Sequence, residues 1–231
     1  MGGKHARRLT WLFALLLGVV AVIPVALIVG LAMRHQRLVN TRPAMPFVEA
    51  PSTMNEMLLA QHILAQSQDA RMRRAVILQV LGTYHHNFVT HLLEAELQRQ
   101  VYALAEAGGS ITAAVLNARK GAILQRFWGD TVDIDDGARM TWMRQPHYYM
   151  GLYPYTYSVG LVASTAMAQR VELEGAPAVA QWLEVLKAGG TQSPMELLQS
   201  AGIDLSTPEP IQAAVSWVGS LIAELEDSFN A

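Results

Sequence analysis

Three histidines, His85, His86 and His91, lie close together in the middle of the chain. Two histidines on one helix bind a metal ion together only when they are three or four residues apart, so that both imidazoles lie on one face. These three are separated by one, five and six positions, so we interpret them as surface or cleft-lining residues. Glu94 follows His91 by three residues, but such pairs are common on polar helix faces and do not indicate a metal site by themselves.

A second group of possible metal ligands is acidic, because Asp130, Asp133, Asp135 and Asp136 precede Gly137. A calcium loop needs oxygen ligands at alternating positions and a closing glutamate. Position 134 is an isoleucine, and no glutamate stands at the closing position. We therefore expect the carboxylates to mark the start of a helix, near the positive end of its dipole.

Two further groups contain glutamate, histidine and tyrosine. Glu49 precedes a proline turn, and Glu56 lies seven residues after Glu49. A lone glutamate before such a turn is most often a solvated loop residue or a helix cap. Tyrosines between helices most often pack with a solvated hydroxyl, although hydroxyl and imidazole donors can also stabilise a developing oxyanion. The residues concerned are His147, Tyr148, Tyr153, Tyr155 and Tyr157.

The order of these motifs resembles a known family. The segment FVEAPS at residues 47–52 is similar to the one that holds the third zinc ligand in the thimet oligopeptidase and oligoendopeptidase F family of zinc peptidases. Residues 146–149 (PHYY) and 153–160 (YPYTYSVG) resemble the histidine and tyrosine segment of that family. The similarity continues through residues 186–190, 193–198, 201–204 and 207–210, and it extends over roughly residues 40 to 228.

The resemblance implies an all-α fold, the helical C-terminal part of a zinc oligopeptidase, and a family that hydrolyses short peptides. It gives Glu49 the role of a zinc ligand and Glu56 that of a residue supporting the ligand histidines. It implies oxyanion and substrate contacts for His147 and Tyr155. It implies substrate contacts for Tyr148, Tyr153 and Tyr157.

The HExxH motif of the family occurs nowhere in the 231 residues. This motif supplies two zinc ligands and the general base, and in the family it lies about 25 residues before the third ligand, which here falls near Pro24. Catalytic zinc has about three protein ligands, and Glu49 supplies one. We therefore expect the chain neither to bind catalytic zinc nor to cleave peptides alone, so that activity would need a missing N-terminal peptidase half.

An apolar run without a charged residue extends from Trp11 to Met33. At about 1.5 Å per residue it would form a helix of roughly 34 Å, enough to cross the hydrocarbon core. We predict a basic flank at residues 1–10, a transmembrane helix at 11–33 and a single-pass membrane location. A signal peptide is the alternative, but no clear cleavage site precedes Arg34. Basic residues on both sides of the run leave the orientation open.

The composition excludes several other classes. There are no cysteines, so disulfides, thiolate metal sites and cysteine nucleophiles are absent. The net charge of −2 and the scattered basic residues give no basic face, and we therefore expect no nucleic-acid partner. The residues that follow the apolar run, 34–231, are enough for one core.

Hydrophobic periodicity predicts helices and almost no strand. Residues 34–53 contain three prolines and are predicted to be a linker that carries the Glu49 segment. Residues 54–231 are predicted to be an all-helical domain. Its helices are expected at 54–66, 69–107, 111–128, 137–143, 153–173, 176–188 and 210–227. Gly108 and Gly189 should end helices, Ser110 can cap the helix after it, and residues 193–196 (SPME) form a capping box.

Two functions of different classes follow from the sequence. The first is the partial zinc oligoendopeptidase described above. The second is a membrane-anchored helical module that binds peptides or a protein partner without cleaving them, with His147 and Tyr155 as contacts. A rearranged gene product with an accidental apolar lead is a third possibility.

Overall fold

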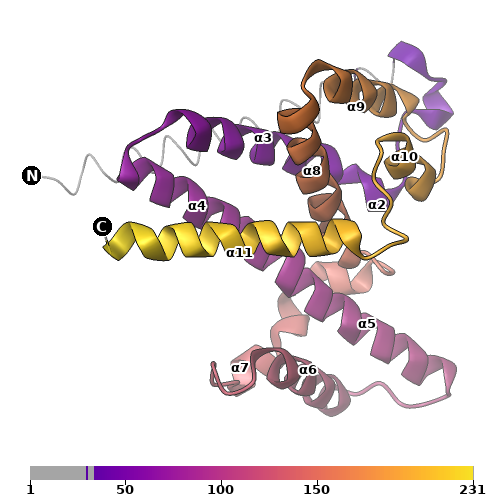
Figure 1. Ribbon diagram of the computed structural model, residues 1–231. Helices are drawn as coiled ribbons and strands as arrows, with labels where there is room; N and C mark the ends of the chain where they lie inside the picture. Colours follow the sequence, from indigo (N-terminus) through magenta and orange to yellow (C-terminus); the bar gives the residue numbers. More distant parts are fainter. Residues whose placement is uncertain (1–29, 31–33, 231) are drawn as a thin grey trace, which may run out of the picture. The chain divides into compact units, whose positions relative to one another are not determined.

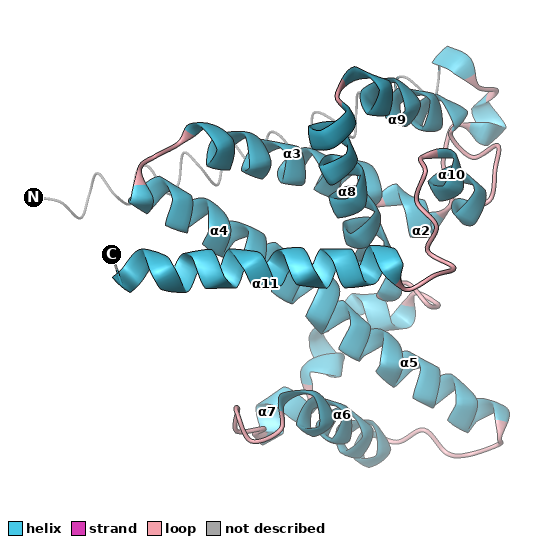
Figure 2. Cartoon of the chain, viewed as in Figure 1, coloured by secondary structure: helices cyan, strands magenta, loops and turns pink. Residues whose placement is uncertain are grey.

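The computed structural model describes residue 30 and residues 34–230. These residues form helices joined by loops and turns (Figure 1). No strand occurs among them (Figure 2), which confirms the predicted all-helical fold. The described residues divide into two compact units, those up to residue 82 together with 159–230, and residues 83–158. The boundaries between the units fall within helices α4 and α8.

The first unit combines helices from both ends of the chain. They are α2 (Met45–Val48), α3 (Ala50–Gln66), most of α4 (Ala70–Tyr84), most of α8 (Tyr155–Glu174), α9 (Ala176–Ala188), α10 (Pro194–Ser200) and α11 (Glu209–Asn230), preceded by the short 3-10 helix η1 (Leu38–Asn40). Side chains from α2, α3, α8 and α10 form its core. At most 2% of the surface of each of these is exposed: Phe47, Met54, Met57, Leu161, Met167, Leu197 and Leu198.

Helix α4 lies beside α11 in this unit (Figure 1). Arg73 forms an ion pair with Glu224 at 2.5 Å. The neighbouring Arg74 donates a hydrogen bond to the carbonyl oxygen of Ser228 at 2.8 Å, and its guanidinium carbon lies 5.0 Å from the ring centre of Phe229. Two consecutive arginines of α4 therefore hold the end of α11.

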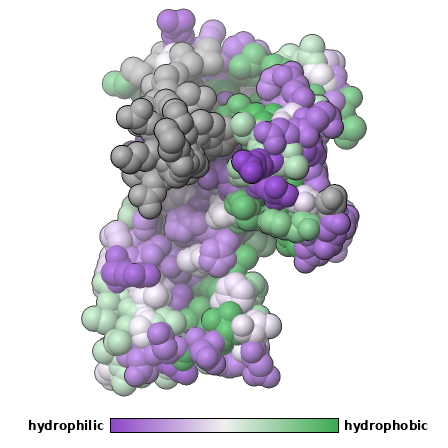
Figure 3. All heavy atoms as spheres, turned by 90° about the vertical axis from the view of Figure 1, so that its left-hand side faces the viewer, coloured by the Kyte–Doolittle hydropathy of each residue, from purple (hydrophilic) through white to green (hydrophobic). Residues whose placement is uncertain are grey.

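Apolar side chains also reach the surface along α11. Ile211, Val215, Ile222 and Phe229 recur every four or seven residues and are 42–70% exposed. Figure 3 shows one face of the molecule, on which apolar residues lie between polar ones. A helix typically packs such an apolar stripe against another element. These four side chains of α11 are instead exposed.

The turn that carries Glu49 packs directly against α8 at Gly160. A Cβ atom at position 160 would lie 3.0 Å from the backbone nitrogen of Ala50 and 3.1 Å from the carbonyl carbon of Glu49. The hydroxyl of Thr53 also donates to the carbonyl oxygen of Gly160 at 3.4 Å. This close approach of two backbones explains the glycine.

We expect Gly160→Ala to lower the free energy of unfolding by about 1–3 kcal/mol, because its methyl group would overpack a backbone contact. Gly219→Ala is the matched control, since that glycine lies within α11 and its added Cβ would meet no atom within 4 Å. The control should gain about 0.5–1 kcal/mol from helix propensity. Urea denaturation measures both, and a stabilising effect at position 160 would contradict the packing described here.

Glycines and a capping box bound the helices as predicted. Gly108 and Gly189, with φ of 75° and 55°, follow the last turns of α5 and α9. At the start of α10, Ser193 accepts a hydrogen bond from the backbone N–H of Glu196 at 3.4 Å, and the Glu196 carboxylate accepts one from the backbone N–H of Ser193 at 2.8 Å. The predicted capping box is confirmed.

Replacing Ser193 by alanine should lower the free energy of unfolding by about 1 kcal/mol, because one backbone donor of the first turn of α10 loses its acceptor. Ser216→Ala, an exposed change inside α11, should change it by less than about 0.5 kcal/mol. Thermal unfolding followed by circular dichroism compares the two. An equal effect at both positions would mean that the cap does not stabilise the fold.

Two details of the helix starts differ from the sequence prediction. Thr112, not Ser110, caps α6 (Ala113–Trp128) and accepts from the backbone N–H of Val115 at 3.3 Å, because the threonine stands directly before the first helical residue. Residues 45–48 and 50–53 are helical although prolines predict a linker there. Pro46 and Pro51 occupy the first turns of α2 and α3, where a missing N–H costs no hydrogen bond. The division into linker and domain itself stays a prediction.

The described helices contradict the predicted single-pass membrane location. Among residue 30 and residues 34–230, no helix is long and apolar enough to cross a membrane. The longest of them, α11, carries Glu209, Glu224, Glu226 and Asp227, and charged groups are expensive in hydrocarbon. This finding contradicts the predicted location, which we withdraw. The apolar run at 11–33 lies outside the described residues apart from Gly30.

The second unit contains an uncommon helix near its start. Residues His85–Thr90 form a π-helix, η2, that joins α4 directly to α5 (His91–Glu106). The predicted helix at 69–107 is therefore one continuous helical path with a π-helical segment, a feature often found at functional sites. Helix α6 packs against α5. The unit continues with α7 (Asp136–Arg139), whose cap Asp135 accepts from the backbone N–H of Ala138 at 2.7 Å, and with two 3-10 helices, η3 (Thr141–Arg144) and η4 (Pro146–Tyr149).

Candidate functional site

Four aromatic side chains of the second unit form a cluster, here called the His–Tyr cluster: His91, His147, Tyr153 and Tyr157. They come from four different places in the chain. His91 begins α5, His147 lies in η4, Tyr153 precedes α8 and Tyr157 is in the first turn of α8. The hydroxyl of Ser158 donates to the carbonyl oxygen of Asn87 in η2 at 3.0 Å, and this bond fixes the start of α8 against the π-helix.

Polar atoms of the His–Tyr cluster form a connected row. The hydroxyl oxygens of Tyr153 and Tyr157 are 2.9 Å apart, and the Tyr157 hydroxyl lies 3.4 Å from Nε2 of His147. The His147 ring stacks on the Tyr153 ring, with centres 5.3 Å apart and planes 6° from parallel. His147, Tyr153 and Tyr157 thus lie together in the structure, while their predicted contacts with substrate stay predictions.

His147 has one ring nitrogen without a partner. Its Nδ1 is buried, and no described residue forms a hydrogen bond with it. Buried polar atoms are almost always paired, so an unpaired imidazole nitrogen beside two tyrosine hydroxyls is a place where a bound molecule can complete the hydrogen bonds. The arrangement can therefore donate to, or accept from, a group such as a peptide amide.

His91 is the member of the cluster that was not recognised as a site residue from the sequence. Its ring stacks on Tyr157 with centres 4.3 Å apart, and its Nδ1–H donates to the carbonyl oxygen of His86 at 2.7 Å. Only 1% of its surface is exposed, and burial lowers its pKa to about 4, so the ring is neutral near pH 7. His85 and His86 are exposed, in agreement with their interpretation as surface or cleft-lining residues, whereas His91 does not lie on the surface.

A buried polar group lies next to the cluster on α5 and α6. Glu94 and Lys120 are 2% and 3% exposed, and Gln145 donates to the Glu94 carboxyl at 2.9 Å. Burial raises the pKa of Glu94 to about 7, an effect that the nearby Lys120 ammonium opposes. Burial likewise lowers the pKa of Lys120. The sequence offered one signal for this buried group. The spacing of three residues places His91 and Glu94 on the same face of α5, and that face is buried.

Tyr148 and Tyr155 are not in the His–Tyr cluster. The Tyr148 hydroxyl is 3.4 Å from Nζ of Lys120, and burial raises the pKa of this tyrosine hydroxyl. Tyr155 precedes Tyr157 by two residues on α8, which corresponds to about 200° around a helix, and it contacts none of the cluster rings among the described residues. The predicted substrate roles of both tyrosines remain predictions.

Glu49 and Glu56 lie in the first unit. Glu49 is the residue between α2 and α3, and Glu56 lies seven residues further along α3. Both side chains are half-buried. The packing of Gly160 against this turn, described above, fixes the backbone of Glu49. Their predicted roles at a zinc ion are not tested by this geometry.

The sequence of this chain matches a known protein family over most of its length. Residues 31–217 match the family described as Peptidase family M3. The chain belongs to this family. The resemblance seen in the FVEAPS segment and in the histidine and tyrosine segments is therefore confirmed.

M3 peptidases from several bacteria are similar to this chain over part of their length. Oligopeptidase PepF of Bacillus subtilis (strain 168) is 31% identical over 179 residues, which are 78% of this chain and 27% of that protein. The plasmid oligoendopeptidase F of Lactococcus lactis subsp. cremoris is 28% identical over 178 residues, 77% of this chain and 30% of that protein. This chain thus spans less than a third of the length of these M3 relatives.

Solved structures share the fold. The crystal structure of oligoendopeptidase-F from Enterococcus faecium matches with a TM-score of 0.82 and 24% identity, covering 94% of this chain and 40% of that one. A putative peptidase from Chlamydophila abortus matches with a TM-score of 0.79 and 26% identity over 89% of this chain and 34% of that one. The helical arrangement described here is therefore that of oligoendopeptidase structures.

The M3 family is zinc-dependent, and the residues of this chain can be tested against that requirement. In the part of the chain that the structure describes, no three His, Asp or Glu side chains come together in a group that could hold a metal ion. The HExxH motif is missing from the whole sequence. Because catalytic zinc needs about three protein ligands, the described residues do not fit a catalytic zinc site.

Proposed function

We propose that this chain binds short peptides through the His–Tyr cluster and does not hydrolyse them by itself. The observation that carries the proposal is the row of polar atoms on Tyr153, Tyr157 and His147, which ends at a buried, unpaired imidazole nitrogen. A peptide backbone offers N–H donors and carbonyl acceptors at regular intervals, which suit such a row.

The choice of short peptides as ligands rests on the M3 relatives. Their names, Oligopeptidase PepF and oligoendopeptidase F, describe proteins that act on oligopeptides. A chain that keeps the histidine and tyrosine segment of the family keeps groups able to contact such a ligand. The expected absence of hydrolysis rests on the missing HExxH motif, which would supply the general base and two metal ligands.

Glu49 and Glu56 have a conditional place in this proposal. If a separate peptidase half supplied the two histidines and the general base, Glu49 would be the remaining zinc ligand and Glu56 would support the ligand histidines. In the chain alone, Glu49→Ala should leave peptide affinity unchanged. The peptide-binding role therefore depends on the second unit and not on these glutamates.

His147→Ala should weaken the binding of a short peptide about tenfold, because it removes a hydrogen-bonding ring from the cluster, one net hydrogen bond is worth up to about 1.5 kcal/mol, and about 1.4 kcal/mol corresponds to tenfold in affinity. Tyr157→Phe should weaken binding to a similar degree, since its hydroxyl connects Tyr153 with His147. Isothermal titration calorimetry on the full chain measures the affinities.

The matched control is His62→Ala, which removes an exposed imidazole of α3 that lies outside the cluster. It should leave the affinity unchanged. Equal affinities for the wild type, His147→Ala and Tyr157→Phe would overturn the proposal.

A further inference from the structure

Three polar side chains occupy the buried face of α5. His91, Glu94 and Gln98 follow one another at spacings of three and four residues, so they lie on one face of the helix. Only 1%, 2% and 3% of their surfaces are exposed. A helix usually buries an apolar stripe, because burial of a polar group costs free energy unless the group is hydrogen-bonded. Such a departure is typical of a functional site, so the partners of these side chains indicate their role.

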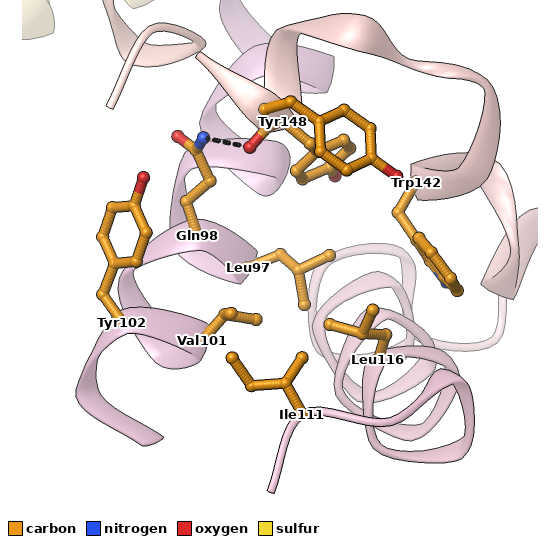
Figure 4. A pocket seen from close by; sticks show the side chains of 9 residues that line it. Leu97, Gln98, Val101, Tyr102, Ile111, Leu116, Trp142 and Tyr148 are labelled. Atoms are coloured by element: carbon orange, nitrogen blue, oxygen red, sulfur yellow. Dashed lines mark hydrogen bonds between the residues drawn. The ribbon is translucent and has the colours of Figure 1, made fainter. Parts of the chain in front are cut away.

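Two of these side chains reach the ends of η4, the short helix that carries His147. Directly before η4, Gln145 donates from Nε2 to the Glu94 carboxyl at 2.9 Å. At the other end, Nε2 of Gln98 donates to the carbonyl oxygen of Tyr148 at 3.1 Å, drawn as a dashed line in Figure 4, and to that of the residue after η4 at 3.4 Å. Helix α5 therefore holds η4 on both sides of His147.

Apolar packing around η4 is incomplete, because a pocket of about 200 Å³ lies beside it (Figure 4). Tyr148 and Tyr149 of η4 line this apolar pocket together with Leu97 and Val101 of α5. Side chains that border a void lack contact atoms on that side and gain less dispersion energy. We therefore attribute much of the attachment of η4 to its hydrogen bonds with α5.

The place of η4 on α5 decides the place of the His147 ring in the cluster. Tyr157 is itself fixed to α5, because its ring stacks on that of His91 with centres 4.3 Å apart. The Tyr157 hydroxyl lies 3.4 Å from Nε2 of His147. This distance is near the upper limit for a hydrogen bond, so a small shift of η4 along α5 breaks the contact.

We propose that Glu94 and Gln98 are positioning residues, which hold η4 on α5 and thereby keep the His147 ring in the His–Tyr cluster. Their contribution to affinity rests on the proposed peptide binding, since it acts through His147. The place of the His147 ring can be measured without any peptide. The two parts can therefore fail separately.

Gln98→Met removes both donated hydrogen bonds and nearly keeps the length of the side chain, because methionine has no donor. In nuclear magnetic resonance spectra of the full chain, the signals of the His147 ring protons should change, since this ring lies in the ring current of Tyr153, with centres 5.3 Å apart. Gln125→Met is the matched control, because it removes an exposed amide of α6 that donates to the carbonyl oxygen of Gly129 at 2.7 Å. The control should leave these signals unchanged. Identical His147 signals in the wild type and Gln98→Met would overturn the proposal.

Peptide titrations measure the consequence for affinity. Gln98→Met should weaken binding about threefold, less than the loss of His147, because the ring is displaced and not removed. In the His147→Ala background the same change should have no further effect, since the residue through which it acts is absent. An equal loss in both backgrounds would show that Gln98 acts independently of His147 and would refute its positioning role.

A pair of variants tests Glu94. Glu94→Gln keeps an oxygen acceptor for Gln145 and should retain the wild-type affinity for peptides. Glu94→Met nearly keeps the length of the side chain but removes the acceptor, and it should weaken binding about threefold. Should this variant fail to fold, Gln145→Met breaks the same hydrogen bond from its other end and should weaken binding to the same degree. Wild-type affinity in the methionine variants would refute the role of Glu94.

The same measurements separate this inference from the proposed function. If no peptide binds to the wild type, the proposed function fails, and the His147 ring signals still decide whether α5 positions η4. If peptide binding depends on His147 but not on Gln98 or Glu94, the proposed function stands and the positioning role fails.

Discussion

Glu94→Gln should stabilise the protein, and the gain should increase as the pH rises from about 5 to about 8. In the folded state burial raises the pKa of Glu94 from 4.5 to about 7. Between these values the folded protein holds a proton that the unfolded chain has already lost. The free energy of unfolding of the wild type therefore falls with rising pH in this window. Glutamine does not titrate, so the variant lacks this loss.

The expected size follows from the pKa difference. The pKa of Glu94 is about 7 in the folded protein and 4.5 for an ordinary glutamate, and each pH unit between these values corresponds to about 1.36 kcal/mol, which gives about 3 kcal/mol as the full effect. Glu94 is 2% exposed, so solvent screening reduces this value little. The groups that face it are Lys120, whose charge opposes the shift, and Gln145, which donates to the carboxyl.

Urea denaturation at several pH values measures this effect, with Lys120→Met as a second variant. Removing the ammonium should raise the pKa of Glu94 further, so that the loss of stability still begins near pH 4.5 and continues to higher pH. His91 contributes with the opposite sign, because its pKa is lowered from 6.5 to about 4 and its stabilisation is lost as the pH falls through this range. Parallel stability curves of the wild type and Glu94→Gln would show that Glu94 titrates normally.

Phe47→Ala should lower the free energy of unfolding by about 3–5 kcal/mol, as expected for truncating a fully buried phenylalanine. Phe47 is 2% exposed and packs against Trp182, with ring centres 5.7 Å apart. It also begins the FVEAPS segment, two residues before Glu49. The loss should therefore combine a cavity between α2 and α9 with a less ordered Glu49 turn.

Phe229→Ala is the matched control, because Phe229 is 70% exposed and has the guanidinium of Arg74 over its ring. The loss of this cation–π contact should cost about 0.5–1 kcal/mol. Chemical denaturation of both variants gives the comparison. A loss at Phe47 as small as that at Phe229 would mean that the Glu49 segment is not anchored by this core contact.

Much of the fold could be predicted from the sequence because its signals are local. The glycines at 108 and 189 and the capping box at Ser193 each act within one helical turn, and the helix predicted at 176–188 coincides with α9. The family followed from separated motifs in a fixed order. Local signals were weaker at Pro46 and Pro51, where proline is compatible with both a linker and a helix start.

The candidate site could be predicted only in part, because periodicity shows which residues share a face and not whether that face is buried. His91 and Glu94 were three residues apart in the sequence, yet only packing shows them to be 1% and 2% exposed. Tyr148 belongs to the same segment as His147 but turns toward Lys120. The apolar pocket combines segments more than 50 residues apart in the sequence, from Leu97 to Tyr149, and no local pattern indicates it.

Equilibrium dialysis of the full chain against a defined mixture of short peptides, with the bound fraction identified by mass spectrometry, tests the central claim most directly. It reports both retention and cleavage of each peptide. We predict that the wild type retains intact peptides, that retention falls about tenfold in His147→Ala, and that no cleavage products form. Products that depend on Glu49, or retention that is the same in His147→Ala, would contradict the account.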